Sequence, residues 1–437
     1  MMITKRILPI VALGVAFVVA ATTPMRYGTG LKATGSDEPA HTIFTNPGED
    51  CSTSMSVSFA TPVGKESKLV LINKASGDTS VVVSKGVICT TFDSINSKLG
   101  DNSDVYERHV FDHHVVRLTD LTPDTRYEYY IESATPSGVV KSEPHYFITA
   151  GAPAWKAAVI GDFHHYSPLW GRIDHSMSMI NVIDSVAGGV DWVLSPGDQC
   201  AWGGSYNYWT ELASQPQYKS MMWGAVQGNH DHMTRDNAKS DLYFRDSHAN
   251  PDNGYSGQEG ISYWFKYGDV LFIMLNNEAM RTKASLEPVF EWMEKVVAEN
   301  PSRYIVVVEH YEWLIGTNGT NSQLDRFYEI FDRLGVDLAI SGNNHAYLRT
   351  PALKDRQPVA AGQGTFYVVA SSSDNGRGRA LKPIEANDEI ISTRWSEGAH
   401  TVGAMLMDVD STRIVMSLYD RNGSVRDTFT VPAKSAR

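Results

Sequence analysis

The sequence has little cysteine, with three such residues among 437. Cys51 and Cys89 lie in its first third, and in an oxidising compartment we expect them to form a disulfide, with two free thiols as the alternative. Cys200 is left over. Because no cysteine near it in the sequence offers a partner, redox catalysis by a dithiol is not indicated.

The sequence also lacks an excess of basic residues. Lys and Arg number 38 against 50 Asp and Glu, which gives a formal net charge of −12. This balance argues against a surface that coats nucleic acid. A phosphorylated small-molecule substrate is not excluded, because bound cations would set the field at a site whatever the net charge.

Long apolar runs are missing after Thr23, so no later segment is predicted to cross a membrane. Before that point, Lys5 and Arg6 precede the apolar residues 7–21, and small residues follow. A run of about 15 residues is short for a membrane span of roughly 20. The pattern is typical of a signal peptide over residues 1–22, with an uncleaved anchor as the alternative. We therefore expect an exported protein, periplasmic or secreted.

The length of 437 residues favours two domains. Residues 38–150 are predicted to contain strands only, because Met55, Val57 and Phe59 alternate with serine or alanine as in a half-buried strand. At residues 121–129 a Pro-Asp turn leads into alternating tyrosines, one of which could join two sheets through its hydroxyl. This part resembles the fibronectin type III-like domain that precedes the catalytic domain in purple acid phosphatases, which implies an all-β sandwich.

Residues 155–432 alternate short apolar strands with helices. Leu324, Phe327 and Phe331 lie on one face of a predicted helix that Gly335 ends. Hairpins are predicted over residues 262–273 and 401–432. Further strands are predicted at residues 157–160, 191–194, 223–226, 305–308 and 338–340.

Polar residues follow these last strands in five short segments. The segments are GDFH at 161–164, GD at 197–198, GNHD at 228–231, VVEH at 307–310 and GNNH at 342–345. In open α/β sheets, ligands bind at the carboxyl ends of strands, so we expect the five segments to converge. Their carboxylate, amide and imidazole groups are the donors that a pair of divalent metal ions needs.

The order of these motifs resembles the calcineurin-like metallophosphoesterase superfamily, and with the N-terminal domain it resembles the purple acid phosphatase branch. The resemblance implies an α/β domain of two mixed β-sheets flanked by helices, and a site for two divalent metal ions that hydrolyses phosphate esters. The implied ligands of the first ion are Asp162, His164, Asp198 and His345. The implied ligands of the second are Asn229, His310 and the bridging Asp198.

Two positions depart from the purple acid phosphatase pattern. Ala201 stands where that branch has a tyrosine whose phenolate colours the enzyme, while His164 supplies a ligand. The exchange implies a colourless site that holds Mn²⁺, Zn²⁺ or Fe²⁺. Asn343 stands where a histidine is usual, and an amide oxygen from Asn343 or Asn344 would give a weaker second site.

His230 follows Asn229 and is placed to protonate the leaving group, and Asp231 could orient its ring. His165, His232 and Tyr311 would line the pocket or form its rim. The aromatic residues at 202–209 would stack on a substrate or pack beneath a loop.

We expect a phosphomonoesterase that acts through a metal-bridged hydroxide. A phosphodiesterase or nucleotidase is the alternative within the enzymes. An exported binding or adhesion module that has lost activity is the alternative from another class, and Asn343 keeps it open.

Overall fold

The structure is a computed structural model that describes residues 26–27, 37–94, 106–165, 172–232, 242–280, 282, 285–317, 322–374, 376–382 and 388–433. The predicted signal peptide over residues 1–22 lies outside this part of the chain. None of the helices within the described ranges is both long and apolar enough to span a membrane.

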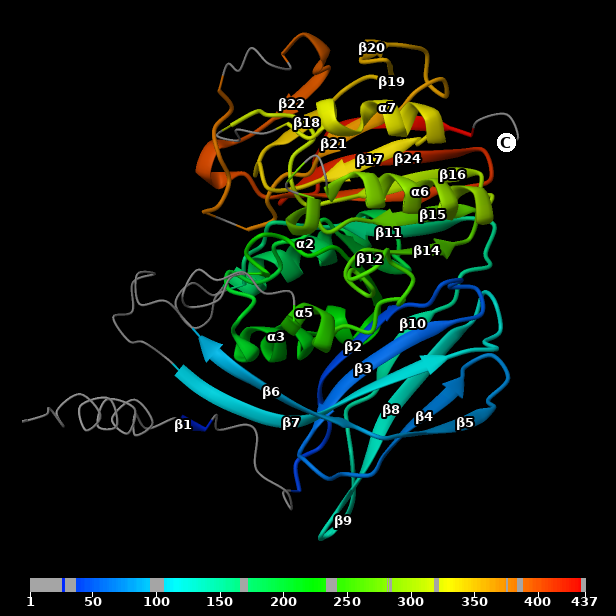
Figure 1. The fold of residues 1–437 in the computed structure, drawn as a ribbon, viewed down its shortest axis with the longest axis vertical. Helices are drawn as coiled ribbons and strands as arrows, with labels where there is room; N and C mark the ends of the chain where they lie inside the picture. The colour runs from blue at the N-terminus through cyan, green and yellow to red at the C-terminus, as the bar shows by residue number, and fades with distance from the viewer. Residues whose placement is uncertain are drawn as a thin grey trace, which may run out of the picture.

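Two sheets form the N-terminal part, which is drawn in blue to cyan at the bottom of Figure 1. One contains β1 (Arg26–Tyr27), β2 (His41–Pro47), β3 (Met55–Thr61), β6 (Val87–Ser94) and β7 (Tyr106–Leu118). The other contains β4 (Ser67–Asn73), β5 (Thr79–Ser84), β8 (Arg126–Thr135), β9 (Gly138–Lys141) and β10 (His145–Ile148). The predicted β-sandwich is confirmed, whereas its fibronectin type III-like character stays a prediction.

A tyrosine hydroxyl joins the two sheets, as the sequence predicted. The Tyr129 hydroxyl on β8 lies 2.6 Å from Thr45 Oγ1 on β2. Tyr127 makes a local contact instead, since its hydroxyl accepts the Thr122 N–H at 2.8 Å.

The prediction that β3 is half-buried is wrong, because every residue of this strand is buried. Its serines face the catalytic part of the chain, where Ser58 Oγ donates to the Ser247 carbonyl at 2.5 Å. A neighbouring contact runs from Asn46 Nδ2 to the Trp223 carbonyl at 3.1 Å. The two parts of the chain therefore share a close interface that alternation within one strand could not reveal.

The predicted Cys51–Cys89 disulfide is also wrong, because neither cysteine forms a disulfide. Cys51 is buried in the main core, with its Sγ 3.9 Å from Met222 Sδ. Cys89 packs instead on the hydrophobic cluster that contains Cys200. The two residues of the expected pair thus belong to different clusters of the interior.

Two mixed sheets form the catalytic part. One has the order β13 (Met222–Ala225), β12 (Trp192–Ser195), β11 (Trp155–Val159), β23 (Gly403–Val409), β24 (Arg413–Asp420), β25 (Val425–Pro432). The other has the order β14 (Tyr263–Tyr267), β15 (Val270–Met274), β16 (Tyr304–Val308), β17 (Leu338–Ser341), β21 (Phe366–Val369), β18 (Tyr347–Arg349), β22 (Thr393–Trp395). A separate hairpin pairs β19 (Leu353–Lys354) with β20 (Gln357–Pro358). Both predicted hairpins are confirmed, by β14–β15 and by β23–β25.

Helices cover the outer faces of these sheets, and apolar side chains fill the space between the sheets. Val159 and Leu194 of the first sheet share one cluster with Val306 of the second. The helices around the first sheet are α2 (Arg172–Ala187), α3 (Tyr206–Ala213), α4 (Pro216–Ser220) and α5 (Leu242–Ser247). Those on the second are α6 (Glu287–Glu299) and α7 (Leu324–Leu334), and α7 ends at Gly335 with φ 69°, as predicted. Short 3₁₀ turns lie at Asn277–Met280, Asp388–Ile390 and Gly398–His400.

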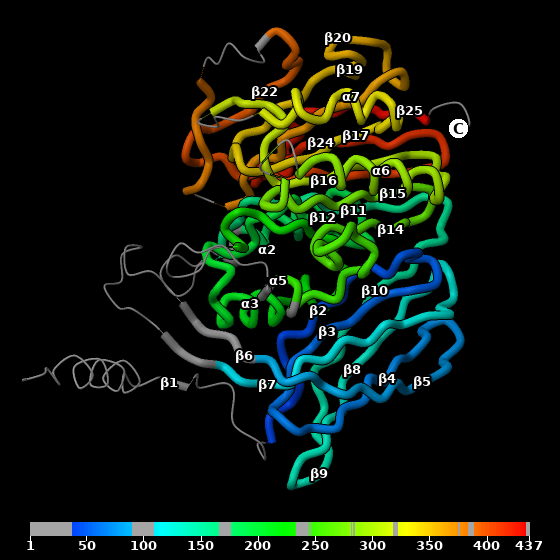
Figure 2. Tube along the Cα trace, viewed as in Figure 1, coloured from blue at the N-terminus to red at the C-terminus, as the bar shows by residue number. Residues whose placement is uncertain are grey.

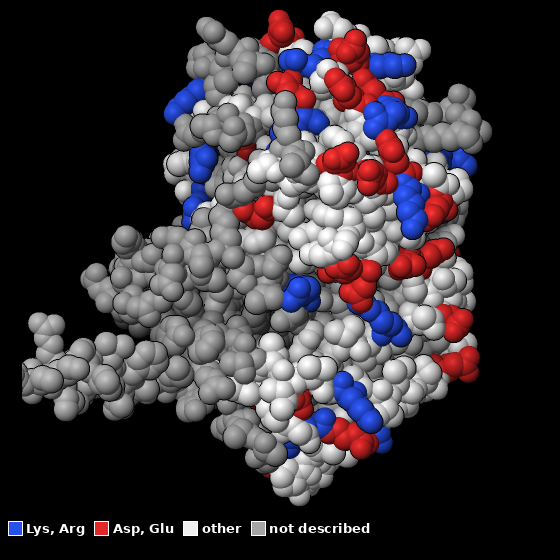
Figure 3. All heavy atoms as spheres, viewed as in Figure 1, with Lys and Arg blue, Asp and Glu red and all other residues white. Residues whose placement is uncertain are grey.

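The parallel strands of both sheets deliver the five polar segments. β11, β12 and β13 are parallel neighbours in the first sheet, and β16 and β17 are parallel neighbours in the second. The C-terminal strands, orange to red in Figure 2, return to the catalytic part, where β23 pairs with β11. On the face drawn in Figure 3, basic and acidic residues are interspersed rather than gathered by sign.

Candidate metal centre

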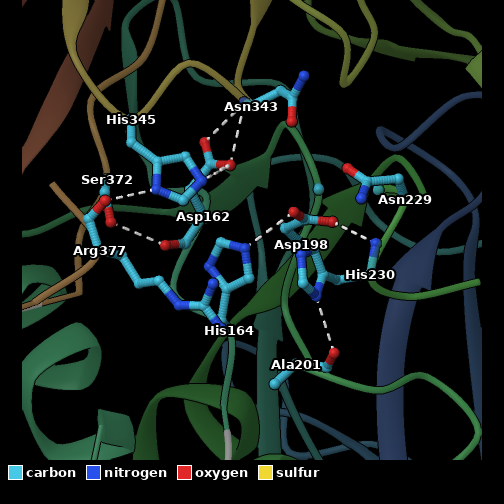
Figure 4. Close-up of polar contacts among 12 residues, drawn as sticks. Asp162, His164, Asp198, Ala201, Asn229, His230, Asn343, His345, Ser372 and Arg377 are labelled. Carbon is cyan, nitrogen blue, oxygen red and sulfur yellow. Dashed lines mark hydrogen bonds and ion pairs between the residues drawn. The ribbon is translucent and has the colours of Figure 1, made fainter. Parts of the chain in front are cut away.

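Histidine and carboxylate side chains from all five predicted segments meet at the carboxyl edge of the two sheets. Ligand atoms lie within 4.8 Å of one another in three groups. The groups are Asp162–His164–His345, His164–Asp198–His230 and Asp162–Asp198–His310. Residues between 162 and 345 thus enclose one small volume (Figure 4).

Asp198 lies at the centre of this arrangement. Its Oδ2 atom is 2.9 Å from His164 Nε2 and 3.2 Å from His310 Nε2. Its Oδ1 accepts the His230 backbone N–H at 2.8 Å. One carboxylate therefore faces both sides of the site, as a ligand that bridges two metal ions must.

The other residues surround Asp198 from two directions. On the first side, His345 Nε2 lies 3.5 Å from Asp162 Oδ1. On the second, Asn229 Oδ1 lies 3.1 Å from His310 Nε2. The division of these residues between two ions stays a prediction, since Asp162 and His310 also form one close group with Asp198.

Backbone carbonyls fix which ring nitrogen of two histidines faces the site. His310 Nδ1 donates to the Pro196 carbonyl at 2.8 Å, and His345 Nδ1 donates to the Arg377 carbonyl at 2.6 Å. Since a carbonyl can only accept, Nδ1 carries the proton in both neutral rings. Nε2 is then left with the lone pair that a metal ion requires.

Backbone strain is concentrated at this site. Of the ten non-glycine residues with positive φ in the described part of the chain, five belong to the predicted ligand set. They are Asp162, His164, Asp198, Asn343 and His345, with φ between 44° and 64°. A residue with a Cβ is strained in this conformation. Such strain persists only where surrounding contacts hold the backbone in place, as they commonly do at functional sites.

Glycines before the ligands allow the loops to approach. A Cβ on Gly228 would lie 2.1 Å from Asp198 Oδ1, and one on Gly342 would lie 2.6 Å from Asp162 Oδ2. Larger residues at these two positions would displace the carboxylates, which explains why glycine precedes the polar residues in these motifs.

Buried polar atoms without hydrogen bonds show that the residues fit a metal ion. His164 is fully buried, and neither of its ring nitrogens makes a hydrogen bond within the described residues, although Nε2 approaches Asp198. Asp198 Oδ2 is buried and lacks a hydrogen bond as well. Buried groups of this kind normally have partners, so a cation that accepts their lone pairs would satisfy them.

Without a bound ion, the buried carboxylates and imidazoles of the site shift one another's pKa values. Burial and the Asp198 charge raise the pKa of Asp162 to about 7, despite the His310 charge. Although burial favours the neutral ring, the carboxylates of Asp198 and Asp162 raise the pKa of His310 to about 10. Burial lowers the pKa of His164 to about 3 even beside Asp198. Positive charge between the two carboxylates would relieve this conflict.

Asn343 and Asn344 have different partners. The Asn343 N–H donates to both oxygens of Asp162 at 3.0 Å, and its Nδ2 donates to Glu312 Oε2 at 2.5 Å. Asn344 Oδ1 accepts the Gly316 N–H at 2.9 Å, so this oxygen is already used away from the site. Asn343 is therefore the candidate of the two for the second ion, and its role as a ligand stays a prediction.

The expectation that Asp231 orients the His230 ring is wrong. His230 Nδ1 donates to the Ala201 carbonyl at 2.9 Å, as Figure 4 shows. The Asp231 carboxylate instead accepts the backbone N–H groups of Gly228 and Cys200, both at 2.9 Å. Asp231 thus ties two ligand loops together and does not contact the ring.

Neighbours of the motifs have supporting contacts. His165 Nε2 lies 2.6 Å from Glu211 Oε2, and His232 Nε2 lies 3.2 Å from Asn276 Oδ1. The Tyr311 hydroxyl donates to Glu278 Oε1 at 2.5 Å. The aromatic residues Trp202, Tyr206, Tyr208 and Trp209 are buried, so of the two expectations for them packing is the one the structure has.

Sequence reasoning missed two groups of residues around the centre. Asn277 Oδ1 accepts the N–H groups of His310 and Tyr311, both at 2.7 Å, and so shapes the His310 loop. It follows β15 at the same sheet edge, a position that could have identified it.

Arg377 and Arg379, from a segment outside the five motifs, add positive charge beside Asp162.

Comparison with known families agrees with this geometry. Residues 156–347 match the calcineurin-like phosphoesterase family. Residues 39–149 match the purple acid phosphatase N-terminal domain. The chain therefore contains a calcineurin-like phosphoesterase domain preceded by a purple acid phosphatase N-terminal domain. Members of this family are phosphoester hydrolases with a dinuclear metal centre, and the chain is a hydrolase of this class.

Solved structures show the same fold. A purple acid phosphatase, PPD1, from yellow lupin (Lupinus luteus) seeds superimposes with a TM-score of 0.70 at 15% identity, over 91% of this chain and 75% of the lupin chain. PhoD superimposes with a TM-score of 0.57 at 10% identity, over 93% of this chain and 94% of PhoD. No curated protein matches the sequence.

Proposed function

We propose that this metallophosphoesterase is an exported phosphatase that hydrolyses phosphate monoesters. The observation that carries the proposal is the set of buried donors around Asp198, whose Oδ2 atom lies close to Nε2 of both His164 and His310. Two oppositely placed imidazoles on one carboxylate oxygen suit a pair of divalent ions better than a packed core.

The proposed ligands are Asp162, His164, Asp198 and His345 for one ion and Asp198, Asn229, His310 and Asn343 for the other. Such a pair of ions, when bound, neutralises phosphoryl oxygens and lowers the pKa of a coordinated water. We propose Mn²⁺, Zn²⁺ or Fe²⁺ and a colourless protein, because Ala201 provides no phenolate. Elemental analysis and the visible absorption spectrum of the purified protein test this assignment.

His230 would handle the leaving group. Its Nδ1–H is held by the Ala201 carbonyl, so Nε2 is the atom that can exchange a proton. Burial lowers the pKa of His230, although the Asp198 charge opposes this effect. Asp231 would support catalysis by keeping the loops of Gly228 and Cys200 in register.

Domain boundaries and export belong to the proposal as well. We propose that residues 38–150 and 155–432 are the two domains, and that residues 1–22 form a cleaved signal peptide. Sequencing the N-terminus of the protein from its native host tests the cleavage.

The function is tested by measuring phosphate release from an aryl phosphate monoester, with and without added Mn²⁺. We expect metal-dependent turnover, and slower turnover of the corresponding diester. Preference for the diester would favour a phosphodiesterase, and absence of turnover in a metal-replete sample would favour a binding module.

A further inference from the structure

Two arginines reach the metal centre from a segment that none of the five motifs includes. Arg377 lies between Asp374 and Arg379, and its charge interacts with Asp374, Asp198 and Arg379. Arg379 in turn influences Asp162 and Glu312. Figure 4 shows the Arg377 side chain extending from beneath His345 toward His164.

The start of this segment is fixed on the loop that carries Asp162. Ser372 Oγ donates to the Asp162 carbonyl at 2.9 Å, and Ser373 Oγ donates to the Gly161 carbonyl at 2.8 Å. The contacts join the segment directly to a strained ligand loop. A shift of either would therefore move the other.

The backbone on either side of Arg377 is also held. The Arg377 carbonyl accepts the His345 Nδ1–H at 2.6 Å, and the Gly376 N–H donates to the Ala399 carbonyl at 3.1 Å. A Cβ on Gly378 would lie 2.4 Å from the Gly398 carbonyl oxygen, so only glycine fits between the two arginines. A long side chain on a fixed backbone has a restricted reach, which favours a defined ligand contact.

The Arg377 guanidinium group has a spare donor. Its Nε is buried and has no hydrogen-bond acceptor within the described residues. A buried donor without an acceptor is costly, and an anionic oxygen at the metal centre would complete it. Two divalent ions would more than offset the charges of Asp162 and Asp198, and the guanidinium groups would then add to a positive field.

We propose that Arg377, supported by Arg379, binds the terminal oxygens of a phosphate monoester and so determines specificity for monoesters over diesters. The inference rests on the proposed function and names the residues that select its substrate. A monoester carries about two negative charges near neutral pH. In a diester, a second ester group replaces one of the charged oxygens that the guanidinium fork would bind.

The first test measures the binding of inorganic phosphate to the Mn²⁺-loaded full chain by titration calorimetry. We expect Arg377→Gln to weaken binding by about tenfold to a hundredfold, the effect of losing a charged hydrogen bond. Arg377→Lys should lie between this variant and the wild type, because lysine keeps the charge but loses the fork. Arg413→Gln is the matched control, since Arg413 is exposed and pairs at 3.5 Å with Asp410 on a surface turn.

The second test compares kcat/KM for an aryl phosphate monoester and the matching diester. Arg377→Gln should lower the monoester value by the same factor as phosphate affinity, and the diester value by less than about threefold. Equal losses for both esters, unchanged phosphate affinity, or loss of bound metal in Arg377→Gln would overturn the inference.

The two proposals can fail separately. A wild-type protein that hydrolyses the monoester while Arg377→Gln behaves identically contradicts the role of Arg377 alone. A wild-type protein that hydrolyses neither ester contradicts the proposed function, and the phosphate titration still decides whether Arg377 binds the anion.

Discussion

Both halves of the molecule bury histidines, but they surround them differently. In the sandwich, the ring of His114 stacks on Phe59 with centroids 4.5 Å apart, and hydroxyls of Thr61 and Ser84 contact its two nitrogens. In the metal centre, the Nε2 atom of His310 faces the Asp198 carboxylate at 3.2 Å. Both rings are fully buried, so burial alone does not distinguish a core histidine from a ligand.

The charge that faces each ring makes the difference. Burial lowers the pKa of His114 to about 4, because no carboxylate compensates for desolvation. Burial acts on His310 in the same direction, yet the charges of Asp198 and Asp162 raise its pKa to about 10. A buried histidine that faces several carboxylates therefore indicates a cation site, whereas one enclosed by rings and hydroxyls indicates a core.

Among the predictions that test this difference between the two kinds of buried histidine, replacing Asp198 with asparagine should have the largest effect. The substitution removes the shared negative charge that both His164 and His310 face. We expect kcat/KM to fall by more than a hundredfold and bound metal to decrease, since even supporting partners of ligands cost about 10–100-fold. Asp269→Asn, at an exposed aspartate that pairs with Arg303, is the control. Normal metal content and activity in Asp198→Asn would contradict the bridging role.

His230→Ala tests a histidine at the border between the two classes. Its ring belongs to one of the ligand groups, but its Nδ1–H donates to the Ala201 carbonyl, which leaves Nε2 to exchange a proton. We expect kcat to drop by about 10²–10⁴-fold with nearly unchanged metal content. Elemental analysis of the variant is decisive, because loss of metal would make His230 a ligand.

His114→Ala should have the opposite profile. Loss of a fully buried, stacked ring should lower the free energy of unfolding by about 2–4 kcal/mol, while kcat/KM stays within about twofold. Denaturant unfolding and monoester kinetics on the same sample measure both effects. The exposed His400→Ala should change neither. A large loss of activity without a loss of stability would mean that the sandwich histidines act in catalysis.

The smallest effect concerns pH. Burial, with a contribution from the Lys219 charge, lowers the pKa of His145 from 6.5 to about 3. Below pH 6.5, His145 is therefore protonated in the unfolded chain but stays neutral in the folded protein. The free energy of unfolding consequently falls as the pH is lowered. For this residue we expect a loss of about 2 kcal/mol between pH 7 and pH 5.

Replacing His145 with phenylalanine should remove that part of the pH dependence, because the new ring can still stack on Tyr129. Unfolding of both proteins at pH 7 and pH 5 gives the comparison. An identical pH dependence in the variant would show that the folded protein protonates His145 as readily as the unfolded chain does, which would contradict the lowered pKa.

Much of the fold and of the candidate site could be predicted from sequence because the candidate ligands follow local rules. A polar residue that follows a glycine or an apolar run at the end of a parallel strand has few other roles, and five such segments were enough to anticipate the cluster. The same reasoning failed for Asp231, since spacing gives no side-chain direction. It also missed Arg377, whose place near the ligands depends on serine contacts to the loop of Asp162.

The sandwich was harder to predict in detail. Alternation in β3 indicated one solvent-facing side, but that side packs on the catalytic part through Ser58. The Cys51–Cys89 pairing failed for a related reason, because the two thiols belong to different clusters of the interior. Contacts between distant parts of the chain leave no periodic signal within one strand.

The most direct test of the paired-ion site is a crystal structure of the Mn²⁺-loaded protein with anomalous scattering data. Two peaks are expected about 3.5–4 Å apart on either side of Asp198. One should contact Asp162, His164 and His345, and the other Asn229 and His310. Peaks at other residues, or a fully loaded protein without a peak beside Asp198, would contradict the account.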